Sequence, residues 1–218
     1  MAFPAIQIHS EPDDVDSSLA RLGLTREPFD NAAREGLAAY IHCTPHHPAT
    51  FPGTSQWAET NRSLRDGLAP FKWSSVNQTN QPLVINASKT MAITAVSGDA
   101  NTGLKDQFPC TRSSKGVRTA DAIRANQGRF EFMDPAPVIE SMKIEGRSTW
   151  LFLFYRDTLR GELRYELSKP TSMSDDGHVD DWSERIIFPP VPFDVETKIG
   201  GGDGGQSPEI VVEVRRRG

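Results

Sequence analysis

The feature that most constrains the fold is a strongly hydrophobic segment in the second half of the chain, residues 147–170. Residues 150–155 (WLFLFY) form an unbroken apolar run rich in aromatic side chains. Such a run is typical of a strand covered on both faces, although a buried helix is the alternative. The polar stretch that follows, 156–161, ends in a glycine that suits a turn. We therefore predict a β-hairpin over about residues 148–168.

The second strand of this hairpin has a different pattern. Residues 162–167 (ELRYEL) alternate between polar and apolar side chains. Because successive side chains of a strand project to opposite faces, the leucines and the tyrosine would share one face. We expect the other face to be exposed to solvent, with Glu162, Arg164 and Glu166 on it.

The rest of the chain predicts a single α+β domain with a mainly antiparallel sheet, in which the hairpin is central and two or three helices pack. The 218 residues suffice for one core, and we assign 1–199 to this domain. Apolar spacing predicts a helix over 29–41, after Pro28. The remaining predicted elements are a strand at 6–8, a helix from Asp16 or Ser17 to Leu22, a helix over 58–68, two strands over 83–96, a helix from Thr119, strands at 130–133 and 138–144, and a strand at 184–188.

Composition points to a soluble, cytoplasmic protein. The formal net charge is −5, which argues against a general nucleic-acid coat. The first residues lack the pattern of a secretory leader, and no apolar window is long enough to cross a bilayer. Cys43 and Cys110 are far apart and fit free thiols in a reducing compartment.

The most chemically suggestive region combines a small-residue loop with a basic segment. A predicted strand leads into the loop SGDANTG, and the basic segment precedes the helix expected from Thr119. Backbone amides and a helix N-terminus favour phosphate, although neither nucleotide-binding glycine motif is present. The alternative is a long connection with turn residues. The candidate ligand-binding residues are Ser97, Gly98, Asp99, Asn101, Thr102, Gly103, Arg112, Lys115 and Arg118.

Two further clusters contain metal-ligating side chains. The sequence HCTPHH places His42, Cys43, His46 and His47 close together, but prolines interrupt it and adjacent histidines rarely bind one ion. The acidic stretch around Asp175 and Asp180 lacks the EF-hand spacing. We interpret the first as a loop of helix-terminal histidines stabilised by the helix dipole and the second as a solvated loop, and we assign no metal and no cofactor.

The C-terminus consists of a glycine-rich linker, residues 200–207, and a β-prone basic tail, residues 208–218 (PEIVVEVRRRG). The tail suits pairing with the parent sheet, addition to a partner's sheet edge, or binding of an acidic partner or nucleic acid. No catalytic constellation is recognisable. The leading hypothesis is a non-enzymatic interaction or regulatory module, a subunit of a bacterial or phage-type assembly, that associates with itself or a protein partner through this tail. The alternative hypothesis is binding or processing of a phosphate-bearing ligand, nucleotide or nucleic acid, at the loop 97–103.

Overall fold

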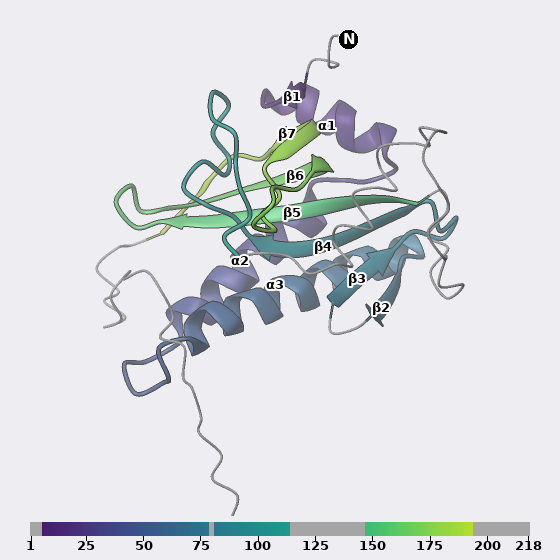
Figure 1. Ribbon diagram of the computed structural model, residues 1–218. Helices are drawn as coiled ribbons and strands as arrows, with labels where there is room; N and C mark the ends of the chain where they lie inside the picture. The colour runs from purple at the N-terminus through teal and green to yellow at the C-terminus, as the bar shows by residue number, and fades with distance from the viewer. Residues whose placement is uncertain (1–5, 79–80, 114–146, 194–218) are drawn as a thin grey trace, which may run out of the picture.

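The computed structural model describes residues 6–78, 81–113 and 147–193 (Figure 1). Its helices are α1 (Pro12–Arg21), α2 (Glu27–Ile41), α3 (Phe51–Leu68) and the 3-10 helix η1 (Ala69–Phe71). Its strands are β1 (Gln7–His9), β2 (Ser74–Gln78), β3 (Gln81–Ile85), β4 (Met91–Ser97), β5 (Ser148–Asp157), β6 (Glu162–Ser172), β7 (Asp181–Ile187) and β8 (Val191–Pro192).

The strands form one sheet in the order β1-β7-β6-β5-β4-β3-β2, and β8 pairs with the first residues of β6. The α+β class is as predicted, but the prediction of a mainly antiparallel sheet is wrong, because the sheet is mixed. β4 is parallel to β5, and β1 is parallel to β7. The reason is that the long connection from β4 to β5 brings the chain back to the end of the sheet at which β4 began. Local patterns do not reveal the direction of such a return.

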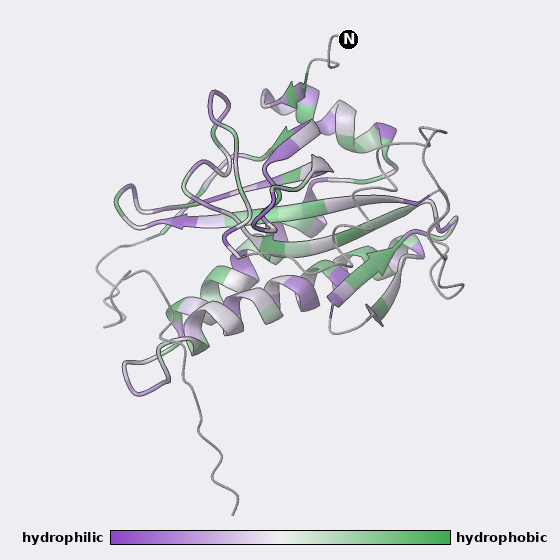
Figure 2. Cartoon of the chain, in the orientation of Figure 1, coloured by the Kyte–Doolittle hydropathy of each residue, from purple (hydrophilic) through white to green (hydrophobic). Residues whose placement is uncertain are grey.

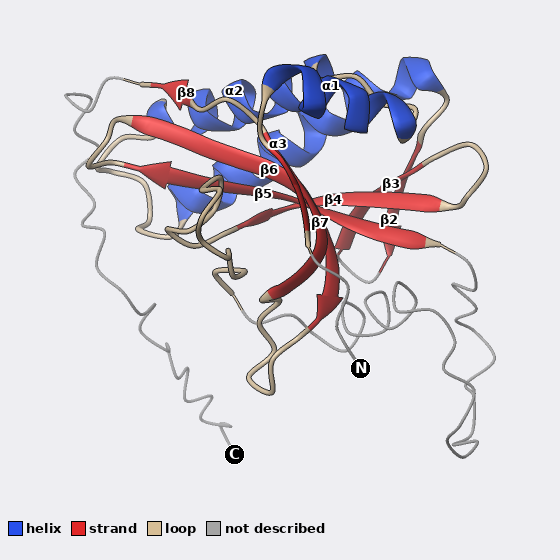
Figure 3. Ribbon diagram, turned by 90° about the horizontal axis from the view of Figure 1, so that it is seen from above, coloured by secondary structure: helices blue, strands red, loops and turns tan. Residues whose placement is uncertain are grey.

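The predicted hairpin is present as the antiparallel pair β5 and β6, in the middle of the strand order. The three α-helices all lie on one face of the sheet (Figure 3). Between the two layers lies a core that includes Phe29 of α2, Phe152 of β5 and Phe188 after β7. The hydrophobic colouring of β4 and β5 in Figure 2 marks these central strands.

Several predicted boundaries differ from the structure. The first helix begins at Pro12 rather than near Asp16, because proline is tolerated at the first helical position. For the same reason α3 begins at Phe51 with Pro52 in its first turn, seven residues before the predicted start. The edge strand β2 was not predicted, since its residues SSVNQ are mostly polar. The elements predicted between residues 119 and 144 lie outside the described residues.

The helices α2 and α3 approach each other closely because of two glycines. A Cβ atom at Gly36 would lie 2.0 Å from Oγ1 of the buried Thr60, and one at Gly67 would lie 3.1 Å from Cβ of Pro28. The Thr60 hydroxyl also donates to the Gln56 carbonyl on its own helix, 2.8 Å away, which restrains its rotation. The helix pair therefore has no room for a side chain at position 36.

A hydrogen bond between Tyr165 and Asp30 joins α2 to the sheet. The Tyr165 hydroxyl of β6 donates to Oδ1 of Asp30 on α2 over 2.8 Å. Burial of the phenol, reinforced by this hydrogen bond to Asp30, raises the pKa of Tyr165 above its ordinary value of 10.0. The folded protein therefore keeps this hydroxyl protonated at a pH where the unfolded chain releases its proton.

We predict that Gly36→Ala lowers the free energy of unfolding by about 1–3 kcal/mol, because the added methyl overpacks the contact between α2 and α3. Urea denaturation measures the change. Gly53→Ala is the matched control: this helical glycine has open space around its Cβ position, so the gain in helix propensity of up to about 1 kcal/mol should dominate. Equal effects of the two substitutions would contradict the close approach at Gly36.

We also predict that Tyr165 contributes to the loss of folding stability at alkaline pH. Because its folded-state pKa is raised, the stability that it contributes is complete below about pH 10 and falls as the pH rises above that value. Tyr165→Phe should be less stable at neutral pH by about 0.5–1.5 kcal/mol, but lose less stability between pH 9 and pH 11. Urea unfolding across this range tests it, with Tyr155→Phe, at a half-buried position of β5, as the control. Identical pH slopes for Tyr165→Phe and the wild type would refute this role.

Candidate functional site

The sheet face away from the helices is covered, over β5 to β7, by the connection that follows β4, residues 98–112. This connection contains most of the residues predicted to bind a ligand. Its two ends come together where Gly98 pairs with Thr111 as an isolated antiparallel bridge. The Asp99 amide donates to the Cys110 carbonyl, and the Arg112 amide donates to the Ser97 carbonyl. Residues 98–112 are called the sheet-covering loop below.

A fully buried ion pair lies beneath this loop. Glu166 of β6 and Arg185 of β7 are both 0% exposed. Arg185 Nε lies 3.0 Å from Glu166 Oε1, and Nη2 lies 2.6 Å from Oε2, so the contact is bidentate. Ser168 Oγ donates to Oε1 over 2.6 Å, and the Gly103 amide donates to Oε2 over 2.8 Å. The carboxylate thus accepts four hydrogen bonds.

The other donors of Arg185 reach the loop backbone. Its Nη1 donates to the Gln107 carbonyl over 2.7 Å, and Nη2 also donates to the Leu104 carbonyl over 3.1 Å. Burying a guanidinium is costly unless its donors have partners, and every nitrogen of Arg185 has one. The ion pair therefore fixes the middle of the loop to β6 and β7.

Arg164 holds an earlier part of the same loop. Its Nη2 donates to the Ala100 carbonyl over 2.9 Å and to Asp157 Oδ2 over 3.0 Å. Gly103 packs against the stem of this arginine: its φ is +74°, and an added Cβ would lie 2.8 Å from Arg164 Cβ. Only glycine combines this backbone conformation with this close approach.

These contacts correct the prediction that the polar face of the second hairpin strand is exposed to solvent. Arg164 is 4% exposed and Glu166 is 0% exposed. Glu162, at the start of β6, is half-buried. The alternation correctly places these side chains on one face, but that face is covered by the loop rather than by water.

The structure brings the predicted loop residues together, but it places their backbone amides toward the protein. The amides of Gly98, Asp99 and Gly103 donate to Phe154, Cys110 and Glu166. Those of Asn101 and Thr102 donate to the Asp99 side chain and carbonyl. Arg112 is exposed at the end of the loop, whereas Lys115 and Arg118 lie outside the described residues. Ligand binding at this loop remains a prediction.

The far end of the loop is fixed to β7 and the turn before it. The amide of Thr111 donates to the Val179 carbonyl, and the Thr111 hydroxyl accepts a hydrogen bond from the Val179 amide. Trp182 Nε1 donates to the Pro109 carbonyl over 2.9 Å. Trp182 is 1% exposed, so this end of the loop belongs to a second small core with Val96, Leu151 and Leu153.

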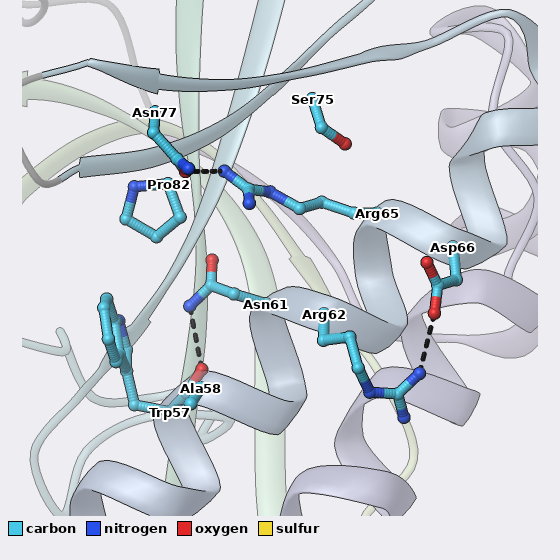
Figure 4. Close-up of a pocket in the computed structure, with 9 residues that line it drawn as sticks. All are labelled: Trp57, Ala58, Asn61, Arg62, Arg65, Asp66, Ser75, Asn77 and Pro82. Carbon is cyan, nitrogen blue, oxygen red and sulfur yellow. Dashed lines mark hydrogen bonds and ion pairs between the residues drawn. The ribbon is translucent and has the colours of Figure 1, made fainter.

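A separate hollow of about 420 Å³ lies between α3 and the hairpin of β2 and β3. It opens to solvent, and Figure 4 shows Trp57, Asn61 and Arg65 of α3 facing Asn77 of β2 and Pro82 of β3 across it. The sequence predicts the helix over 58–68 but not the hollow, because it does not predict β2.

Arg65 spans this hollow. Its Nη2 donates to the Val76 carbonyl over 2.9 Å and to Asn77 Oδ1 over 2.7 Å. Its Nε is buried and has no hydrogen-bond partner in the described part of the chain. Arg62, one helical turn away, is instead surrounded by carboxylates, with Glu59 at 2.6 Å, Asp66 at 2.7 Å and Glu35 at 3.8 Å. Side-chain hydrogen bonding to Glu59 raises the pKa of Arg62.

The two segments with metal-ligating side chains, one around His47 and the other around Asp176, each contain internal contacts. His47 Nδ1 accepts a hydrogen bond from the Thr44 amide, and its ring stacks on Phe51. Asp176 is exposed, and the hydrogen bond from Ser174 lowers the pKa of its carboxyl group. Within residues 6–78, 81–113 and 147–193, no three His, Cys, Asp or Glu side chains are grouped as metal ligands. Cys43 and Cys110 are free, and burial of Cys110 raises the pKa of its thiol.

Comparison with known protein families, with curated proteins and with solved structures finds no match to this chain. No helix in the described part of the chain is long and apolar enough to cross a membrane.

We predict that Glu166→Ala lowers the free energy of unfolding by about 3–5 kcal/mol, because it leaves the buried Arg185 charge without its partner. The measurement is urea denaturation followed by tryptophan fluorescence. Glu59→Ala removes a carboxylate from the surface pair with Arg62 and should cost at most about 1 kcal/mol. Similar losses for the two variants would show that the buried pair does not hold the loop.

Proposed function

We propose that this protein is a non-enzymatic interaction module, a subunit of a bacterial or phage-type assembly, which associates with itself or a protein partner by strand addition. The observation that carries the proposal is the open edge of the sheet at β2. β2 pairs with β3 on one side, and no described strand pairs with its other side. An unpaired edge strand presents backbone donors and acceptors in the register that another strand needs.

The two edges of the sheet differ in how they are protected. β1 has three residues, and charged groups gather beside it: His9 contacts Asp14 and Glu184, and Arg21 contacts Glu184. β2 has five residues, and Ser74, Ser75, Val76 and Asn77 are all exposed. Short length and nearby charges discourage strand addition at β1, whereas β2 is longer and its own side chains are uncharged. The proposed docking surface is therefore β2.

The buried polar residues support a structural rather than a catalytic use. Glu166, Arg185 and Arg164 form the largest buried charged group among the described residues, and their hydrogen bonds go to the sheet-covering loop. The strand-prone tail, residues 208–218, supplies a segment for association, and it lies outside the described residues. The alternative function, binding of a phosphate-bearing ligand at loop 97–103, ranks second because the described loop amides already have acceptors.

We predict that the full chain forms a larger, concentration-dependent species and that a chain ending at Ile199 is monomeric. Size-exclusion chromatography with light scattering at several concentrations gives the masses directly. The described sheet is complete at β8, so the shortened chain keeps the whole of it, and circular dichroism checks that it folds. Equal masses for both chains at every concentration, with equal recovery of partners, would rule out association through the tail.

A further inference from the structure

We propose that the acceptor for the tail is the β2 edge of a second copy of this chain, and that residues 209–214 (EIVVEV) add there as a strand beside the Arg65 hollow. This inference rests on the proposed function, because it names the partner and the surface for the association through the tail.

The two faces of β2 have different surroundings. Ser75 and Asn77 line the hollow on the helix side. Val76 lies between them in sequence and therefore projects to the opposite face, where its register partner is Leu83. Leu83, Ile85 and Ala92 form a small apolar cluster there, and Val76 is 38% exposed at its margin. A strand added at this edge would meet polar side chains on one side and, on the other, the exposed Val76 beside a buried apolar cluster.

The tail alternates in the same way. In an extended strand, Glu209 and Glu213 share one face with Val211, and the other face carries Ile210, Val212 and Val214. The acidic face suits the hollow, where Arg65 Nε is buried without a hydrogen-bond partner among the described residues. The apolar face suits Val76 and extends the cluster around Leu83. A strand turned over would bury both glutamates against this apolar cluster, so only one orientation of the faces is favourable.

The charges that follow the strand also match the surface. Three arginines, Arg215, Arg216 and Arg217, end the tail. Around Arg62 the carboxylates of Glu35, Glu59 and Asp66 outnumber the single cation that they contact. An acidic strand followed by arginines therefore finds both a cation and an excess of carboxylates on this surface, and this charge complementarity favours the pairing.

The linker favours exchange between copies over docking within one chain. The Phe193 amide donates to the Gly161 carbonyl, just before β6. From Phe193 to Ser75 of β2, the path crosses five strand-to-strand steps and about eight residues along the strands, so the two residues are about 35 Å apart. That straight line passes through the sheet. A linker would have to run around the helix layer, which is about 10 Å thick, and this path is longer than roughly 40 Å. The 15 linker residues, 194–208, reach at most about 50 Å and on average only about 20 Å. Docking within one chain would require a nearly extended linker, whereas two copies that exchange tails avoid this cost.

The test uses the full chain with a substitution at the acceptor edge. Val76→Lys places a charge on the exposed edge, where it opposes strand addition, and should weaken self-association at least about tenfold. Leu159→Lys is the matched control, since Leu159 is 98% exposed in the turn between β5 and β6, and should leave association unchanged. Light scattering across a dilution series measures both dissociation constants, and circular dichroism verifies the fold.

A charge exchange makes the result specific to the proposed pairing. Arg65→Glu and Glu213→Arg should each weaken self-association, and the double variant should recover it to within about threefold of the wild type. Val76→Lys behaving like Leu159→Lys, or no loss of association in Glu213→Arg, would overturn the β2 acceptor. If the chain ending at Ile199 is monomeric in that case, the tail still mediates association and only the acceptor surface is wrong. If that shortened chain keeps the full-chain mass, both proposals fail.

Discussion

The buried pair of Glu166 and Arg185 is the interaction on which the far face of this sheet depends. A charge removed from water is stabilised only by a partner and by hydrogen bonds to its remaining groups. Here the partners come from two adjacent strands, and the remaining donors and acceptors are satisfied by backbone groups of the sheet-covering loop. If the loop left the sheet, Glu166 would lose the Gly103 amide, and Arg185 would lose the Gln107 and Leu104 carbonyls. This pair therefore favours one conformation for a connection that has no regular secondary structure.

The central hairpin and the helix α2 could be predicted from sequence because their patterns are local. The aromatic run of β5, the alternation of β6 and the apolar stripe of α2 each follow from side chains a few residues apart. The burial of Glu166 could not be predicted in this way. Its partner Arg185 lies 19 residues away, and its contact with Gly103 joins residues 63 positions apart. A polar face looks the same in sequence whether water or a distant loop covers it.

The same limit applies to the predicted ligand site. Small residues and glycines in 97–103 are typical of a loop whose amides hold an anion, and also of a loop whose amides are used by the protein itself. The acceptors that decide between these cases, Phe154, Cys110 and Glu166, lie on other segments. Gly103 illustrates the second use, because its positive φ and the close approach of Arg164 serve the packing of the loop on β6. The parallel pairing of β4 with β5 escaped prediction for a related reason, since it depends on the path of a long connection.

The two faces and the two edges of the sheet are covered to different extents, and this difference indicates the surface for association. The helices cover one face, the sheet-covering loop covers part of the other, and ion pairs of His9 and Glu184 flank the short strand β1. β2 has five residues and borders the hollow. Nη2 of Arg65 donates to the Val76 carbonyl and to the Asn77 side chain of this strand. By holding β2 in place from its helix side, Arg65 keeps the outer backbone groups aligned for a further strand. A pre-ordered edge lowers the entropy cost of adding that strand, because only the incoming segment has to become ordered.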